Sequence, residues 1–236
     1  MIEKMNKALD FLRDKYGIPA GEIVRGKDYF QIRRPDGTTV NLLPWRVERR
    51  FVELKKIIDG KTLEDVSTFR FADFTAGGDL RKTLAKELDL AAWLSGSPVC
   101  RLYAVGGGKV CNVIFRLANG MSGCAECGTA LPDGTKPIDK HEIIARRGVA
   151  CDRVVDSQVP QESIYVWSKN GSSAFTDVDT ELFGLPDDAI WTVRAAFAVL
   201  SHPELADEWN AASELSLRQS DAAFRSAETS QPVEKF

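Results

Sequence analysis

The chain has 236 residues, of which 44% are hydrophobic and 28% are charged, a composition that supports a substantial buried core. The formal net charge of −3 and the pI near 5.6 argue against nucleic-acid binding, which needs a concentrated basic surface. No run of the sequence approaches the roughly 18 apolar residues of a membrane span, and the N-terminal stretch lacks the apolar core of a secretory signal. Because the five cysteines show no small-scaffold spacing, we expect a cytoplasmic protein with free thiols.

The first part of the chain predicts a separate N-terminal element, residues 1–44. Apolar residues recur at three- and four-residue spacing over 2–16 and predict an amphipathic helix, which Gly17 ends. Two β-rich runs then flank the Pro-Asp-Gly sequence at 35–37, which is typical of a β-hairpin.

The remainder predicts helices and strands that are segregated rather than alternating. The expected elements are a helix over 45–59, a strand over 65–74, a helix over 81–95, a block of antiparallel strands to about 168, and helices over 187–200 and 204–226. This order indicates an α+β fold, an open, mostly antiparallel sheet with helices packed on one face. We expect residues 45–225 to form this domain and the polar residues 226–236 to form a mobile tail.

Two motifs resemble the Gfo/Idh/MocA family of sugar dehydrogenases, which includes glucose–fructose oxidoreductase and inositol dehydrogenase. One family motif is roughly G-G-x-x-x-D-x-G-x-H-x-x-D-x-x-x-W-L-x-G, and the residues that match it here are Gly77, Gly78, Asp89, Trp93, Leu94 and Gly96. The other is a helix motif, F-x-x-L-K-x-x-I-D-x-G, matched by Phe51, Leu54, Lys55, Ile58, Asp59 and Gly60. The resemblance covers about residues 45–215 and implies the C-terminal substrate and oligomerisation domain of those enzymes.

The first motif departs from the family at the positions that carry its chemistry. Lys82 stands where the family has an aspartate, Leu84 where it has a glycine, and Lys86 where it has the catalytic histidine. Hydride transfer requires a base for the hydroxyl proton, and a lysine serves only when its pKa is strongly lowered. We expect both lysines to be solvated and paired with the nearby Asp79 and Glu87, so that Lys82 and Lys86 are only weak catalytic candidates.

The other candidate residues are one histidine and the cysteines. His141 could pair in space with Asp139 or with a cysteine, although a single histidine at a strand start is usually a surface or capping residue. Cys124 and Cys127 are three apart in a predicted strand, so they point to opposite faces, and the chain has no second such pair to complete a zinc site. We therefore predict no metal site, and we expect these cysteines, like Cys100, Cys111 and Cys151, to be small buried thiols.

The sequence also predicts no cofactor site. The G-x-G-x-x-G motif of a nucleotide-binding domain is absent, and only about 44 residues precede the region that resembles the family. The glycine cluster at 106–109 is followed by a strand pattern rather than a helix, which indicates a hairpin turn. The alternative is NAD or NADP supplied together with a partner chain.

The apolar strand residues predict self-association. Period-two spacing places Phe69 and Phe71 on one face and Tyr165 and Trp167 on another, and the sheet face without helices would expose apolar area unless a subunit covered it. The resemblance implies a dimer or tetramer through that face.

These observations favour a non-catalytic, oxidoreductase-like domain that self-associates, with a sugar-like ligand or a partner subunit as candidate binding partners. One alternative is a subunit that completes the active site of an NAD(P)-dependent sugar or polyol oxidoreductase in trans, with a partner chain that carries the nucleotide-binding domain. Another is an independent hydrolase, lyase or isomerase with a repurposed pocket. Whether the chain is an enzyme stays open, with the lost acid–base positions favouring no catalysis and with neither nucleic acid nor membrane expected as a partner.

Overall fold

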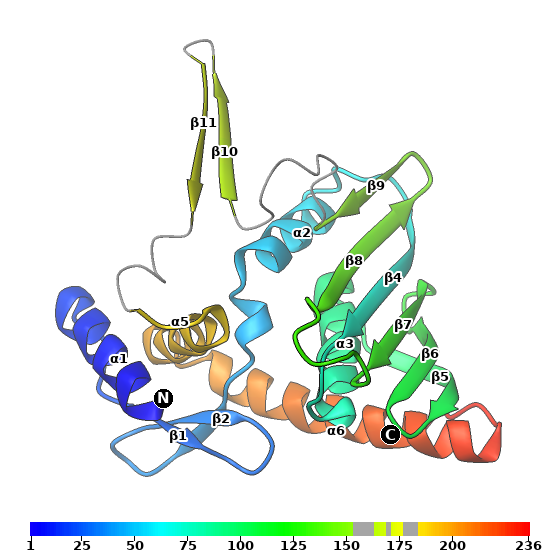
Figure 1. Ribbon diagram of the computed structural model, residues 1–236, viewed down its shortest axis with the longest axis horizontal. Coiled ribbons are helices and arrows are strands. Elements are labelled where there is room, and N and C mark those ends of the chain that lie inside the picture. Colours follow the sequence, from blue (N-terminus) through cyan, green and yellow to red (C-terminus); the bar gives the residue numbers. More distant parts are fainter. Residues whose placement is uncertain (153–162, 169–170, 177–183) are drawn as a thin grey trace. The chain divides into compact units, whose positions relative to one another are not determined.

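The computed structural model describes residues 1–152, 163–168, 171–176 and 184–236, and the chain forms two compact units (Figure 1). Unit one consists of Met1–Val47 and Arg153–Trp209, and unit two consists of Glu48–Asp152 and Asn210–Phe236. This division differs from the predicted boundaries after residues 44 and 225. Unit one includes a later helix as well as the N-terminal element, a long-range association that local sequence patterns do not encode.

The described residues of unit one form two packed α-helices and a small sheet. Its elements are α1 (Ile2–Tyr16), β1 (Glu22–Arg25), β2 (Phe30–Arg33), β3 (Thr39–Asn41), η1 (Pro44–Arg46), β10 (Ser163–Ser168), β11 (Gly171–Thr176) and α5 (Asp187–Ser201). Strands β1, β2 and β3 pair antiparallel in that order, which confirms the predicted hairpin, and β10 pairs antiparallel with β11. Helices α1 and α5 pack together, with the Tyr16 and Phe197 rings in edge contact at 5.5 Å.

Unit two contains the larger sheet. Its elements are α2 (Arg49–Asp59), β4 (Val66–Phe74), α3 (Leu80–Ser95), β5 (Val99–Gly107), β6 (Val110–Leu117), β7 (Ser122–Gly128), β8 (Ile138–Ala145) and β9 (Gly148–Cys151). The strand order is β5-β6-β7-β4-β8-β9, and only the β4–β7 pair is parallel. The fold is therefore α+β with an open, mostly antiparallel sheet, as predicted.

Helices cover one face of this sheet. Helix α3 contacts β4, β5, β6 and β7 (Figure 1), and helix α6 (Leu205–Thr229), which begins in unit one, continues in unit two. The Ser220 hydroxyl on α6 donates to the Arg81 carbonyl at 2.9 Å, and the Asp221 carboxylate binds the Arg81 guanidinium, so α6 lies against the start of α3. The other face of the sheet carries the exposed side chains.

Strand burial follows the predicted period of two. Along β6, Cys111, Val113, Phe115 and Leu117 are buried and the intervening residues are exposed. Gly123 on β7 lies directly opposite Phe115, and a Cβ atom there would lie 2.4 Å from the Phe115 ring. The absence of a side chain at Gly123 is therefore required by the packing of the core.

Two boundaries differ from the sequence prediction. The helix expected from residue 45 begins at Arg49, because Glu48 has an extended backbone with φ −66° and ψ 126°. The expected mobile tail contains the last turn of α6 and a bridge in which Val233 and Leu102 exchange backbone hydrogen bonds of 2.8 and 2.9 Å. The reason is that β5 is an edge strand, whose free backbone groups accept a further partner. No helix among the described residues is long and apolar enough to cross a membrane.

Candidate functional site

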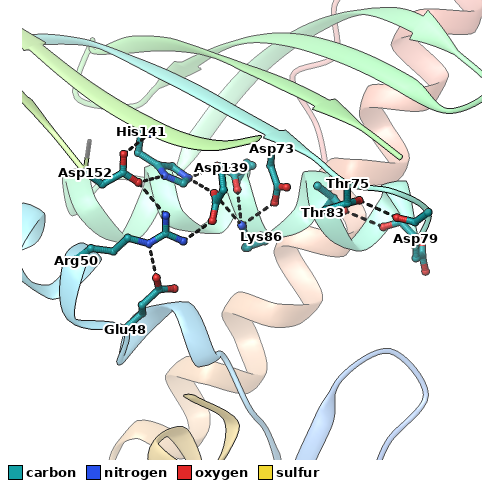
Figure 2. A network of polar contacts seen from close by, with 12 residues as sticks. Glu48, Arg50, Asp73, Thr75, Asp79, Thr83, Lys86, Asp139, His141 and Asp152 are labelled. Atoms are coloured by element: carbon teal, nitrogen blue, oxygen red, sulfur yellow. Dashed lines mark hydrogen bonds and ion pairs between the residues drawn. The ribbon is translucent and has the colours of Figure 1, made fainter. Parts of the chain in front are cut away.

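Unit two contains a cluster of charged side chains at the helix-covered side of the sheet, which we call the acid–base cluster (Figure 2). Its members are Glu48, Arg50, Asp73, Lys86, Glu87, Asp139, His141 and Asp152. They come from the start of α2, from β4, from α3, from β8 and from the residue after β9. Five carboxylates and three basic groups thus meet in one part of the fold.

The strand register brings the sheet residues of the cluster together. Asp73 continues the buried phase of Phe69 and Phe71 on β4, since residues two apart share a face. Strand β8 pairs antiparallel with β4, so that His141 lies opposite Phe71 and Asp139 lies opposite Asp73. The side chains of these pairs therefore point to the helix-covered face.

Helix α3 supplies the other two central residues. Leu84, Leu88 and Ala91 form its buried stripe, and Glu87 lies on the same side with 0% of its surface exposed. The Lys86 side chain is 21% exposed, and its ammonium turns towards the same acids. A carboxylate on an apolar helix stripe is costly unless it is paired, so the partners of Glu87 decide whether the site is stable.

His141 is held on both ring nitrogens. Its Nδ1 lies 2.7 Å from Asp152 Oδ2, and its backbone N–H donates to Asp152 Oδ1 at 2.9 Å. Its Nε2 lies 2.9 Å from Glu87 Oε2, and the Phe51 and Phe71 rings contact the imidazole at centroid distances of 4.6 and 4.8 Å. Burial alone would lower the pKa of His141, but the Glu87 and Asp152 carboxylates raise that pKa to about 9. The imidazole is consequently protonated at neutral pH.

Lys86 is surrounded by carboxylates. Its Nζ lies 2.7 Å from Asp73, 3.1 Å from Glu87 and 3.6 Å from Asp139. Burial opposes the charge of Lys86, yet the Glu87, Asp139 and Asp73 carboxylates raise its pKa well above the usual range. Conversely, burial alone would raise the pKa of Glu87, but Lys86 and His141 lower it.

Arg50 closes the other end of the cluster. Its guanidinium pairs with Glu48 and Asp139 and lies 3.0 Å from Asp152, over the Phe51 ring at 4.3 Å. Burial would raise the pKa of Asp139, but Lys86 and Arg50 hold it well below its usual range. Burial dominates at Glu48 and raises its carboxyl pKa. Asp73 follows Glu48 in this respect, with its pKa also raised by burial.

This arrangement keeps Lys86 and His141 protonated, so neither is free to take a proton from a substrate. Both nitrogen bases that could take a proton, Lys86 and His141, face carboxylates at hydrogen-bond distance. The donor atoms of Glu87, Asp139 and His141 lie within 4.8 Å of one another, a spacing that a metal ion could bridge. The sequence had predicted no metal site, because a single histidine carries no spacing signal of its own.

The structure brings together two of the three candidate residues from the sequence. Lys86 and His141 share Glu87 and Asp139 as partners, whereas Lys82 is a half-exposed residue 3.9 Å from Asp79 and lies outside the cluster. Pairing of the two lysines with Asp79 and Glu87 is confirmed. The expectation that Lys86 is solvated is wrong, because the buried carboxylates around it draw the ammonium inwards.

His141 also differs from its expected surface or capping position, since it is fully buried. The sequence analysis did not single out Arg50 or Asp73. The sequence did carry a signal for Asp73, since it occupies an alternate position of its strand that is otherwise apolar and buried. The position of Asp152 beside His141 depends on the pairing of β8 with β9.

The cysteine predictions are confirmed in part. Cys124 is half-buried and Cys127 is buried, on opposite faces of β7, and Cys111 is buried as well. Cys100 and Cys151 are exposed, contrary to expectation; Cys100 lies where an irregularity in the β5–β6 register interrupts the alternation. The glycine cluster forms the β5–β6 hairpin turn, as predicted. The side chains of Tyr165 and Trp167 lie outside the described part of the chain.

The two motifs from the sequence meet in the fold. The Lys55 ammonium of the α2 motif lies 5.5 Å from the centre of the Trp93 ring of the α3 motif and donates to the Trp93 carbonyl at 3.2 Å. Asp79 caps α3 by accepting a hydrogen bond from the Arg81 N–H at 3.0 Å. Leu84, at the glycine position of the family motif, is completely buried.

Solved structures of dehydrogenases share this fold. The chain is similar to a probable dehydrogenase from Thermotoga maritima, with 14% identity and a TM-score of 0.58 over 81% of this chain and 63% of that one. It is also similar to scyllo-inositol dehydrogenase from Lactobacillus casei, solved with NAD(H) and scyllo-inositol, with 16% identity and a TM-score of 0.58 over 81% and 63%. For myo-inositol 2-dehydrogenase from Lactobacillus plantarum, the identity is 13% and the TM-score 0.56 over 82% and 64%.

The chain thus spans less than two thirds of the length of these dehydrogenases. No protein-family model and no curated protein matches it. The likeness shows that the chain shares the fold of part of these proteins, in agreement with the resemblance to the C-terminal domain of the Gfo/Idh/MocA family.

Proposed function

We propose that this chain provides a non-catalytic, oxidoreductase-type domain that self-associates through the open face of the sheet in unit two. The observation that carries the proposal is the group of apolar side chains on that face. Tyr103 and Val105 on β5 and Val110 and Ile114 on β6 are all exposed, and the exposed fractions of Val105 and Ile114 are 60% and 64%.

These side chains form a patch rather than scattered exposures. Tyr103 pairs directly with Ile114. Val105 lies two pairs further along the same hairpin, opposite Asn112, and Val110 lies four pairs further, opposite Gly107. An open antiparallel sheet whose second face carries adjacent apolar residues is a typical protein-interaction surface. A second copy is the simplest partner, because the same patch on two chains gives a self-complementary interface.

The acid–base cluster supports the non-catalytic part of the proposal. In the resemblance to the family, Lys86 stands at the position of the catalytic histidine. A general base needs a lone pair directed at the substrate proton, whereas the Lys86 ammonium donates towards Asp73, Glu87 and Asp139. The cluster is therefore better suited to holding charge than to accepting a substrate proton.

Sedimentation velocity over about 1–100 μM protein tests the association, a range chosen for the micromolar affinity of a modest interface. We expect the wild-type chain to form a dimer or tetramer, and Ile114→Asp to be monomeric because a carboxylate would be buried in the interface. Phe11→Asp is the matched control, since it places the same charge at an exposed apolar residue on α1 in unit one. A monomeric wild type, or an Ile114→Asp variant that still associates, would contradict the proposal.

Calorimetric titration with the oxidised and reduced forms of NAD and NADP tests the non-catalytic part. We expect no saturable heat at millimolar cofactor. Saturable binding would overturn this part and favour a subunit that completes a dehydrogenase site with a partner chain.

A further inference from the structure

We propose that Glu87, Asp139 and His141 form a binding site for one divalent transition-metal ion, with zinc as the ion that fits best. The site lies wholly within unit two, between α3 and β8. Its use does not depend on self-association or on the absence of catalysis.

The donor atoms already stand at ligand spacing. His141 Nε2 lies 2.9 Å from Glu87 Oε2 and 3.6 Å from Asp139 Oδ1. Two ligands about 2.1 Å from a zinc ion are about 3.0 Å apart at a right angle and about 3.4 Å apart at the tetrahedral angle. The two separations from His141 bracket these values, and all three donor atoms lie within 4.8 Å of one another, so an ion could bind after small side-chain shifts.

The histidine is oriented as metal-binding histidines are. Asp152 Oδ2 lies 2.7 Å from His141 Nδ1, and the Arg50 guanidinium forms an ion pair with the same carboxylate at 3.0 Å. This support points Nε2 at Glu87 and Asp139 (Figure 2 shows Asp152, His141 and Asp139 in this relation). The ion would take the place of the Nε2 proton, which is released to solvent on binding. A carboxylate behind the imidazole then fixes the tautomer of the ligand and strengthens its bond to the metal.

Two buried oxygens in the site accept no hydrogen bond of good geometry from the described residues, and the Lys86 ammonium lies 3.1 Å from one and 3.6 Å from the other. They are Glu87 Oε1 and Asp139 Oδ1, and Glu87 is completely buried. Buried carboxylate oxygens without hydrogen bonds are rare and indicate an ion or water that completes them. Asp139 Oδ1 is also the Asp139 oxygen that lies 3.6 Å from His141 Nε2, so this oxygen faces the proposed ion.

The charge balance points the same way. The acid–base cluster contains five carboxylates against Arg50, Lys86 and His141, an excess of two negative charges when all groups are ionised. A divalent cation compensates such an excess. The mixed imidazole and carboxylate donors suit zinc, and also manganese or iron, better than calcium.

Lys86 is the competitor for this site. Its Nζ lies 3.1 Å from Glu87 Oε1 and 3.6 Å from Asp139 Oδ1, where its charge repels a second cation. Replacement of Lys86 by leucine should therefore tighten metal binding. We expect at least a tenfold gain, because the ammonium and the metal compete for the same oxygens.

The test uses the full chain stripped with a chelator and then titrated with Zn²⁺ by calorimetry and with Co²⁺ by visible absorption. We expect one ion per chain, Co²⁺ d–d bands displaced by Zn²⁺, and loss of both signals in Glu87→Gln and His141→Gln. All variants are made in a Cys100→Ser/Cys151→Ser parent chain, which lacks the two exposed thiols that could compete as ligands. Glu126→Gln is the matched control, since it removes an exposed carboxylate on β7 and should bind as the parent chain does.

The variant Lys86→Leu keeps the test decisive if a ligand variant fails to fold. Tighter binding in Lys86→Leu supports the site, since removing a distant lysine would not change the affinity. Weaker Zn²⁺ binding in Asp152→Asn, by about 10- to 100-fold, supports the assigned support of His141. No saturable Zn²⁺ binding, or binding that Glu87→Gln and His141→Gln leave unchanged, would overturn the proposal.

Discussion

Replacement of Lys86 by leucine should strongly destabilise unit two in the absence of metal. The ammonium has three carboxylate neighbours, and the side chain of Glu87 is 0% exposed and that of Asp73 9% exposed, so solvent cannot take over its role. Removing one partner of a buried ion pair costs about 3–5 kcal/mol, and we expect about 3 kcal/mol because Lys86 is partly accessible. Leucine keeps apolar contacts in place of the lysine stem, so the loss reports on the charge.

The assay is urea unfolding in the presence of a chelator. A loss of about 3 kcal/mol shifts the midpoint by about 1–2 M for a transition with an m-value near 2 kcal/mol/M. Because the chain has two compact units, hydrogen exchange of peptides from α3 assigns the transition to unit two.

Lys82→Leu is the matched control on the same helix. The Lys82 ammonium is 3.9 Å from Asp79 and both side chains are exposed, so its loss should cost less than about 0.5 kcal/mol. The double variant Lys86→Leu/Glu87→Gln should recover part of the stability, since it removes the most deeply buried uncompensated charge. Equal effects of Lys86→Leu and Lys82→Leu would refute the view that the cluster depends on the Lys86 charge.

Three further predictions concern packing, thiols and the C-terminus. Gly123→Ala should lower the unfolding free energy of unit two by about 1–3 kcal/mol in urea titration, because its Cβ would lie 2.4 Å from Phe115 and 2.9 Å from the Phe69 carbonyl; a neutral effect would contradict this packing. A thiol reagent should label Cys100 and Cys151 rapidly and Cys111 and Cys127 only on unfolding, since burial raises the pKa of both buried thiols, and mass spectrometry of labelled peptides checks the order. Deletion of 230–236 should speed hydrogen exchange at Leu102, whose N–H donates to Val233 at 2.9 Å, and unchanged exchange would show that the bridge does not form in solution.

The sequence predicted the elements of the fold well because their signals are local. The apolar spacing of α1 and α3, the Pro-Asp-Gly turn and the alternation of β6 each lie within about ten residues. The misplaced start of α2 has a physical reason, since Glu48 leaves helical geometry where its carboxylate pairs with Arg50. Helix propensity alone cannot anticipate such a contact.

The candidate site was less accessible from the sequence because it is assembled from distant segments. Lys86 was found through its position in the family motif, and His141 only as a single histidine at a strand start that could pair with Asp139 or with a cysteine. Asp152, which contacts Nδ1 of His141, lies eleven residues later in the chain. Glu87, which contacts Nε2, lies fifty-four residues earlier. Pairings of this kind follow from strand register, which the sequence constrains only weakly.

The cost of the acid–base cluster is itself informative. Burying several ionised groups costs free energy that well-packed apolar side chains of the same volume would not, so such a cluster is poor as a mere support of the core. Phe51, Phe71 and Leu84 are buried in the same region, which therefore also accommodates large apolar side chains. A ligand that needs their charge therefore better explains why Glu87, Asp139 and His141 lie together. A bound divalent cation would be such a ligand, and the residues that could bind it are already in place.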